Sequence, residues 1–261
     1  MLELVRDAYR YRELIWVLTL KELKIRYKGS LLGYFWSLLN PLLMTAVYVV
    51  VFTVFARVGR FGIENYPIFL MCAMFPWTFY QQALSYSVDS IVNNGSLLRK
   101  VYVPKMVFPL AVVLANGINF LLSLLPLAFF LWFFGIPFHK TWLYLPVPLA
   151  GLALFAAGCG FVVSAANVFF RDTEHIVQVF LRAYFFFCPV IYDLRHIDPK
   201  YHFLLSWNPL LYALDGFRLA LFYGELPSAG QAALTLAIGL LALLLGYAFF
   251  RRFQDSFPLY V

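Results

Sequence analysis

The sequence predicts an all-α integral membrane protein, and three observations support this fold class. Of its 261 residues, 63% are hydrophobic and 13% are charged, whereas about a quarter of the residues in an average soluble domain are charged. A soluble fold of this length could not hide so much apolar surface, because its own surface must face water. The apolar residues also form stretches of about 20 residues, the length with which a helix crosses a bilayer. We therefore expect a single membrane domain over residues 1–261.

Six apolar stretches predict six transmembrane helices. They cover roughly 31–56, 66–88, 107–134, 143–169, 174–193 and 229–250. Arg171, Asp172 and Glu174 separate the fourth from the fifth, and a turn at the membrane surface is expected there because charges are costly at mid-bilayer. The charged N-terminus is not followed by a short apolar core and a small-residue cleavage site, so no cleavable signal peptide is expected.

The distribution of Lys and Arg predicts the orientation. Seven of the 20 fall in the first 28 residues, and the same side holds Arg99, Lys100, Lys105, Arg171, Arg251 and Arg252. The other side holds six: Arg57, Arg60, Lys140, Arg195, Lys200 and Arg218. The positive-inside rule then places both termini, including the tail 251–261, in the cytoplasm. Basic clusters beside apolar segments typically meet anionic headgroups, so membrane lipids rather than nucleic acid are the expected partners.

Residues 8–28, within the N-terminal segment 1–30, predict an amphipathic helix at the cytoplasmic interface. Its apolar face is formed by Trp16, Leu20, Leu23 and Tyr27, and a different face carries Arg10, Lys21, Lys24 and Lys28. Such a helix lies along the membrane surface, either as an anchor that sets the topology or as a gate.

The outer segment 194–228 predicts a second non-spanning element. Asn208 can cap a helix that begins at Pro209, an arrangement that helices favour. The apolar run that follows is too short to cross the membrane and carries Asp215 and Arg218. We expect a short re-entrant or surface helix there.

Aromatic side chains recur on one face of two predicted spans. In the first span the face consists of Trp36, Asn40, Met44, Tyr48 and Phe52, and in the fifth of Phe180, Tyr184, Phe187 and Ile191. Such faces suit the C–H faces of sugars, and their polar groups can form hydrogen bonds. Helix packing and interfacial aromatic belts are the alternative interpretation.

The sequence lacks the motifs of the common enzymes. It contains no P-loop, HExxH, GxSxG or calcium-binding loop, so we expect neither an enzyme nor an ATPase in this chain. Cys72, Cys159 and Cys188 lie inside apolar runs without metal-binding spacing, and a metal site at His196 and His202 is disfavoured because both lie in a polar loop. The spans also hold few ionisable groups, which disfavours a proton-coupled transporter.

Six segments, in order, resemble the membrane subunits of type-2 ABC exporters of cell-surface polysaccharide, the O-antigen, capsule and teichoic-acid permeases. These are "YKGSLLGYFWSLLNPLL" (27–43), "YPIFLMCAMFPWTFY" (66–80), "NNGSLLRKVYVPK" (93–105), "NVFFRDTEHIVQ" (167–178), "CPVIYDL" (188–194) and "NPLLYALDGFR" (208–218). The resemblance implies a homodimer with two separate ATPase subunits. ATP and Mg would bind to those subunits, and no cofactor is expected in this chain.

The resemblance also implies that the loop 89–106 holds a short coupling helix that docks into the ATPase. Its residues suit that role: Asn93, Asn94 and Ser96 can cap a helix, Leu97 and Leu98 give an apolar knob, and Arg99 and Lys100 supply charge. Tyr102 belongs to the same segment, and Pro104 stops the helix before the next span.

Further site residues follow from the resemblance. A cytoplasmic gate helix would bring Lys21, Lys24, Arg26 and Lys28 to the pyrophosphate of a polyprenyl-linked glycan. Trp36, Asn40, Tyr48, Phe52, Phe180, Tyr184 and Phe187 would line the glycan path. Asn208, Pro209, Asp215 and Arg218 would belong to a periplasmic gate.

The function implied is export of a lipid-linked polysaccharide such as O-antigen across the bacterial cytoplasmic membrane, driven by ATP hydrolysis in the partner. Two alternatives remain at this point. One is a type-2 ABC permease for teichoic acid, capsule, a drug or another lipid. The other is a membrane enzyme acting on polyprenyl-phosphate lipids, which would need clustered carboxylates or His near the membrane surface.

Overall fold

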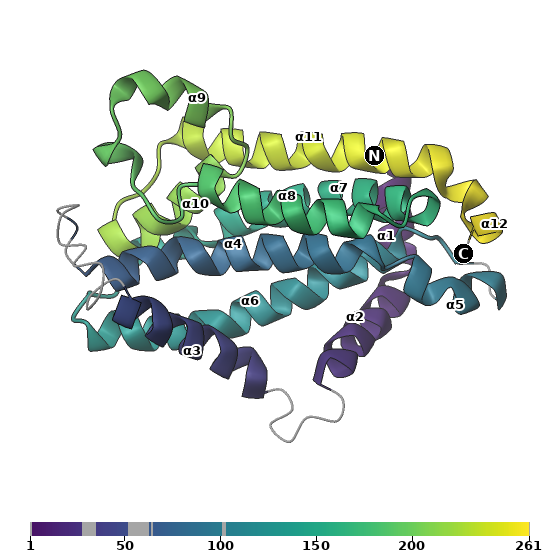
Figure 1. The fold of residues 1–261 in the computed structure, drawn as a ribbon, viewed down its shortest axis with the longest axis horizontal. Coiled ribbons are helices and arrows are strands. Elements are labelled where there is room, and N and C mark those ends of the chain that lie inside the picture. Colours follow the sequence, from purple (N-terminus) through teal and green to yellow (C-terminus); the bar gives the residue numbers. More distant parts are fainter. Residues whose placement is uncertain (1, 28–34, 52–62, 64, 101–102, 261) are drawn as a thin grey trace.

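The computed structural model describes residues 2–27, 35–51, 63, 65–100 and 103–260, and over these ranges the chain is helical and has no strand (Figure 1). The prediction of an all-α fold is confirmed. The α-helices are α1 (Leu2–Arg10), α2 (Arg12–Tyr27), α3 (Trp36–Val50), α4 (Tyr66–Val88), α5 (Gly95–Lys100), α6 (Val107–Phe133), α7 (Pro146–Phe169), α8 (Thr173–Phe187), α9 (His202–Ser206), α10 (Leu211–Arg218), α11 (Ala229–Phe253) and α12 (Phe257–Tyr260). Shorter turns are η4 (Val92–Asn94), η5 (Lys140–Tyr144), η6 (Leu194–His196), η7 (Pro199–Tyr201), η8 (Leu219–Tyr223) and η9 (Gln254–Ser256).

Three helical segments of the described chain are long and apolar enough to cross a membrane: Val107–Phe133, Lys140–Phe169 and Ala229–Tyr260. They correspond to the third, fourth and sixth predicted spans. The helix α4 has the bounds predicted for the second span, but its inner half carries Gln81, Gln82, Ser85 and Ser87. The helices α3 and α8 have 15 residues each, about 22 Å against a hydrocarbon core of about 30 Å. A total of six spans stays a prediction.

The helix α4 is the centre of the bundle. It contacts α6, α7, α8 and α10, and Phe69, Cys72 and Ala83 along it are fully buried. Figure 1 shows α5, α12 and both labelled chain ends toward one end of the bundle, and α9 and α10 at the other. The predicted coupling loop and the predicted outer segment thus lie at opposite ends of the molecule.

The helices α7 and α11 form the most extensive contact in the described chain, and glycines bring their backbones together. An added Cβ at Gly246 would lie 2.1 Å from the carbonyl oxygen of Gly158, and one at Gly239 would lie 2.4 Å from that of Gly151. Real Cβ atoms do not approach so closely, so only glycine fits. Close backbone approach through small residues is a common way to join helices in lipid, where burial of apolar surface drives association only weakly.

The N-terminal helices bury only part of the predicted apolar face inside the bundle. A turn at Tyr11 separates α1 from α2, and α2 packs on α6 with Ile15, Leu18 and Thr19 buried. On the predicted face, Leu23 is buried, whereas Trp16 is 54% exposed. The hydroxyl of Thr19 donates to the carbonyl oxygens of Ile15 (2.8 Å) and Ala111 (3.4 Å), so it fits close to α6.

The predicted fifth span, 174–193, is wrong at its outer end, because α8 ends at Phe187. Cys188 has extended backbone angles (φ −89°, ψ 143°), as expected for a residue that precedes a proline. The chain therefore leaves the helix six residues early and turns back into the bundle.

Candidate functional site

At the end of the bundle that holds α9 and α10, called the outer end here after its predicted orientation, the buried guanidinium of Arg218 binds the chain turn that follows α8. Arg218 is the last residue of α10 and is 1% exposed. Its Nη2 donates to the carbonyl oxygens of Pro189 (2.7 Å) and Val190 (3.0 Å), and its Nη1 to that of Tyr192 (3.2 Å). The guanidinium carbon also lies 3.8 Å from the ring centroid of Phe69 in α4. One side chain thus joins the turn to α10 and α4.

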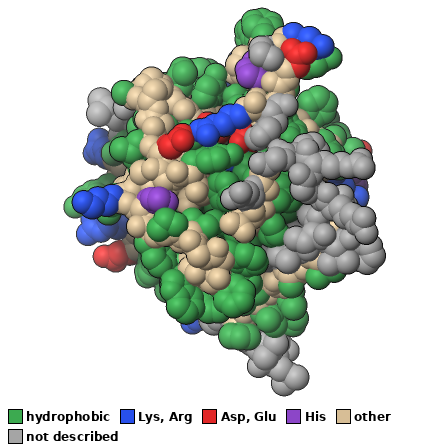
Figure 2. All heavy atoms as spheres, turned by 90° about the vertical axis from the view of Figure 1, so that its left-hand side faces the viewer, with side chains coloured by type: hydrophobic (Ala, Val, Ile, Leu, Met, Phe, Trp, Pro, Cys, Tyr) green, Lys and Arg blue, Asp and Glu red, His purple; other side chains and the backbone are tan. Residues whose placement is uncertain are grey.

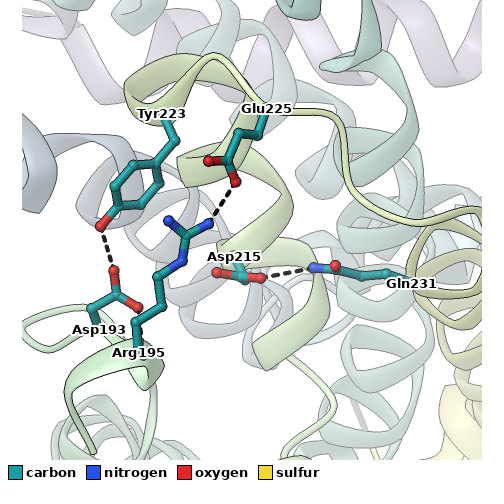
Figure 3. Close-up of polar contacts among 6 residues, drawn as sticks. All are labelled: Asp193, Arg195, Asp215, Tyr223, Glu225 and Gln231. Carbon is teal, nitrogen blue, oxygen red and sulfur yellow. Dashed lines mark hydrogen bonds and ion pairs between the residues drawn. The ribbon is translucent and has the colours of Figure 1, made fainter.

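Next to Arg218, four polar side chains link the outer segments to one another (Figure 3). The carboxylate of Asp193, which is 3% exposed, accepts from the Tyr223 hydroxyl and from the Arg195 backbone N–H. The Arg195 guanidinium pairs with the Glu225 carboxylate at 2.6 Å and lies 4.2 Å from the Tyr223 ring centroid. Burial lowers the pKa of Arg195, but the hydrogen bond and charge of Glu225 outweigh it, so its pKa is raised.

Asp215 joins α10 to the start of α11. Its carboxylate accepts from the Gln231 side chain at 2.9 Å (Figure 3). The predicted gate residues Asp215 and Arg218 therefore lie close together, but the sequence interpretation did not include Asp193, Tyr223, Glu225 or Gln231. Asp193 and Gln231 lie outside the segment 194–228, and Tyr223 and Glu225 reach partners 30 residues away, so no periodicity within that segment could predict these contacts.

Asn208 makes a hydrogen bond of the predicted capping kind and adds two contacts that the sequence did not predict. Its carbonyl oxygen accepts from the Leu210 N–H (3.0 Å) and from the Tyr184 hydroxyl (2.6 Å), and its amide donates to the carbonyl oxygen of Phe187 (2.9 Å). Because these contacts form a turn through Pro209 and Leu210, α10 begins at Leu211, two residues later than predicted. It packs against α4, α7 and α11, which favours the re-entrant interpretation over a surface helix.

Figure 2 shows the outer face, where charged side chains gather in small groups among hydrophobic and neutral ones. Two ion pairs lie in this segment: Arg195 with Glu225, and Lys200 with Asp198 at 3.0 Å. The Nε2 of His202 lies 3.0 Å from the carbonyl oxygens of Leu194 and Ile197. Within the described ranges, no three His, Cys, Asp or Glu side chains come together as metal ligands.

At the opposite end, the short helix predicted within the loop 89–106 is present as α5. Asn93, Ser96, Arg99 and Lys100 are exposed. The predicted apolar knob is wrong, because Leu98 is 9% exposed and Leu97 packs against the same core. The leucines hold α5 on its own bundle and leave its polar side outward. Tyr102 lies outside the described residues.

Asn94 does not cap α5, although the sequence predicted that it could. Its side chain is 5% exposed, donates to the Ser90 carbonyl oxygen at 2.8 Å and accepts from the Lys21 ammonium at 2.6 Å. Lys21 belongs to α2, so this contact ties the predicted gate helix to the segment that precedes α5.

Of the other predicted headgroup-binding cations, Lys24 is exposed. With Lys21 it lines an open pocket of about 500 Å³ whose remaining walls are Val17, Leu20 and Ile25. An apolar surface with two lysines at its edge suits an anionic lipid. The side chain of Arg26 and all of Lys28 lie outside the described residues.

A second, polar cavity of about 220 Å³ lies where α2, α4, η4 and α8 meet, and the sequence interpretation missed it. Its lining residues are Glu22, Ser85, Tyr86, Asp89, Ser90, Asn93, Asn94, Glu174 and Gln178. Asp89 is fixed by a hydrogen bond from the Asn167 amide at 2.8 Å. Three carboxylates from distant parts of the sequence therefore face one cavity at the α5 end of the bundle.

Only some of the residues predicted to line the glycan path have exposed side chains. Trp36, Phe180 and Phe187 are 38%, 50% and 63% exposed, and Asn40 is exposed as well. The Tyr184 ring stacks on Phe180 with 5.1 Å between centroids, and its hydroxyl is taken by Asn208. The side chain of Tyr48 and all of Phe52 lie outside the described residues.

Comparison of the sequence with known proteins identifies its family. The sequence profile described as "ABC-2 type transporter" matches residues 13–222, from α2 through the re-entrant segment. The chain belongs to the ABC-2 type transporter family.

Curated relatives of this ABC-2 transporter cover nearly its full length. It is 34% identical to the O-antigen export system permease protein RfbA of Myxococcus xanthus, over 98% of both chains. It is 30% identical to the RfbA permease of Klebsiella pneumoniae, over 94% of this chain and 93% of the relative. The polysialic acid transport protein KpsM of Escherichia coli is 22% identical, over 92% of this chain and 93% of the relative.

The Lys21–Asn94 contact of this ABC-2 transporter gives a testable prediction. Replacing Lys21 with methionine removes a charge-assisted hydrogen bond, and because the lysine is exposed we expect a loss of about 1 kcal/mol in the free energy of unfolding. The variants Lys21→Met, Asn94→Ala and the double variant form a cycle that measures the pair directly. Lys24→Met is the matched control, since Lys24 lies one turn further along α2 and is exposed. Additive effects of Lys21→Met and Asn94→Ala would contradict the contact.

Proposed function

We propose that this ABC-2 transporter is the permease subunit that exports a lipid-linked polysaccharide, such as O-antigen, across the cytoplasmic membrane. The observation that carries the proposal is the similarity to O-antigen export permeases over 98% of the chain at 34% identity. Exposed aromatic side chains on α3 and α8 support it, because aromatic rings bind sugars without trapping them by charge.

The energy comes from a partner in this proposal. Two separate ATPase subunits bind ATP and Mg, and each contacts the α5 end of one permease copy. The polar side of α5, with Asn93, Ser96, Arg99 and Lys100 exposed, is suited to that contact. A homodimer is proposed because the described part of the single bundle has a packed core around α4, so the glycan path is assigned to the interface between two copies.

The contacts described above suggest how a motion at α5 reaches the substrate. Lys21 links the segment before α5 to α2, and α2 carries Lys24 beside an apolar pocket. A shift of α5 would therefore move the lysines that attract the pyrophosphate of a lipid carrier. At the far end, the turn held by Arg218 would close the outer mouth until the glycan passes.

The proposal is tested by depleting the protein in its host and separating polyprenyl-linked glycan by membrane side. We expect long glycan to accumulate on the cytoplasmic leaflet and to disappear from the cell surface. The double variant Arg99→Glu/Lys100→Glu should reproduce this loss while the protein remains in the membrane. Arg252→Gln, at the cytoplasmic end of α11, is the control. Unchanged surface glycan after depletion, in a strain without a second exporter, would exclude polysaccharide as the substrate.

A further inference from the structure

The helix α8 carries a polar stripe on a side that the bundle leaves uncovered. Glu174, Gln178 and Arg182 are four residues apart and so lie above one another, while Val177 and Leu181 face inward and are buried. The Gln178 amide donates to the Glu174 carboxylate at 3.2 Å. Arg182 is exposed and makes no hydrogen bond or ion pair with a residue in the described part of the chain.

In the predicted fifth span, Arg182 lies near mid-membrane depth. It is nine residues beyond Thr173, where α8 begins, which corresponds to about 14 Å along the helix, or about half of the hydrocarbon core. An arginine that faces lipid at this depth costs about 3 kcal/mol or more. Arginines at membrane depth therefore typically face water-filled cavities or substrate pathways.

The end of the stripe nearest the start of α8 borders a polar cavity. Glu174 and Gln178 line the polar cavity of about 220 Å³ at the α5 end, and Arg182 is one helical turn beyond Gln178. The stripe is thus a continuous polar surface from this cavity to the middle of α8. The exposed ring of Phe186 lies one helical turn beyond Arg182.

We propose that Arg182 binds the phosphate of the lipid-linked substrate midway across the membrane, on a water-filled path along α8. The inference rests on the proposed function and adds a residue that recognises the charged linkage rather than the sugars. A guanidinium offers two parallel N–H groups to a phosphate. A phosphate held there lies outward of Glu22, Asp89 and Glu174, whose negative charges oppose its return to the cytoplasmic side.

Thiol labelling tests the water-filled path. Arg182→Cys is compared with Leu245→Cys, in the assembled transporter in nanodiscs and in a Cys159→Ala background, because Cys72 and Cys188 are buried. Leu245 is 63% exposed and lies eight residues before the end of α11, where its neighbours one turn away on the same face, Leu241 and Phe249, are exposed and apolar. A water-soluble methanethiosulfonate should label the thiol at 182 about tenfold faster or more, since only a hydrated thiol ionises. Equally slow labelling at both positions would overturn the proposal.

The phosphate specificity is tested by stimulation of ATP hydrolysis in the same complex, with geranylgeranyl pyrophosphate and geranylgeraniol as probes. We expect Arg182→Gln to raise the half-maximal concentration of the pyrophosphate by about tenfold or more, with Arg182→Lys between it and the wild type. The response to geranylgeraniol should not change, and Arg252→Gln should behave as the wild type. Any of three results would overturn the proposal. Arg182→Gln could leave the half-maximal concentration of the pyrophosphate unchanged, or shift it equally for both probes. The third result is a wild-type complex whose ATP hydrolysis is not stimulated by the pyrophosphate. The amount of surface glycan in the depleted strain tests the proposed function independently of these two experiments.

Discussion

Replacing Arg218 with methionine is expected to destabilise the protein by about 3–5 kcal/mol, because it removes a buried cation from the groups that it binds. The carbonyl oxygens of Pro189, Val190 and Tyr192 would lose their donors in a place that water does not reach. Unpaired carbonyl groups are costly there. We expect the turn after α8 to leave the bundle, and export to be lost with it.

The measurement is the melting temperature of the purified protein, followed by a thiol-reactive dye that reports exposure of Cys72 and Cys188. A decrease of about 10 °C corresponds to the expected loss. Arg218→Lys should lie closer to methionine than to the wild type, because an ammonium cannot hold a fork of carbonyl oxygens. Arg195→Met is the matched control, since its ion pair with Glu225 is half exposed and contributes about 0–1 kcal/mol. Equal effects at Arg195 and Arg218 would contradict the role assigned to the buried arginine.

Alanine at Gly158 or Gly246 is expected to push α7 and α11 apart. The new methyl group would lie 2.3 Å from the carbonyl carbon and oxygen of Ala242 in the first case, and 2.1 Å from the carbonyl oxygen of Gly158 in the second. Because the neighbouring atoms are backbone, they cannot rotate away. Overpacking of this kind costs about 1–3 kcal/mol and occasionally more.

Gly117→Ala supplies the control for the glycine contacts. Gly117 lies inside α6, and an added Cβ would meet only the Phe79 ring at 3.9 Å, an ordinary contact. Alanine there should raise the melting temperature slightly or leave it unchanged, since alanine favours helix. A lower melting temperature in all three variants would show that helical glycines matter for a reason other than the contact between α7 and α11.

The fold was predictable from the sequence wherever long apolar stretches dominate. The bounds of α4, α6 and α11 agree with the expected stretches within a few residues, because such stretches have no other stable form in lipid. The outer end of α8 was not predicted, since Pro189 alone did not reveal that Arg218, 29 residues later, would bind the carbonyl groups released there.

The candidate sites were harder to predict, because a short segment does not show which of its faces is covered. Leu97 and Leu98 were expected to face a partner but pack on their own bundle. Asn94 was expected to cap α5 but binds Lys21 from α2. Both depend on contacts between segments distant in the sequence, which periodicity within one segment does not contain.

The course of α4 has a mechanical consequence. This helix extends for about 34 Å. At one end the Phe69 ring contacts the Arg218 guanidinium, and at the other end Val88 precedes Asp89, which lines the polar cavity. Because α4 is one long helix, a tilt at one of its ends can be transmitted to the other end of the molecule. Pro76 lies between them and removes one backbone hydrogen bond, which concentrates bending at that point. Bending at Pro76 therefore allows the α5 end of α4 to begin to move while Arg218 still holds the outer end.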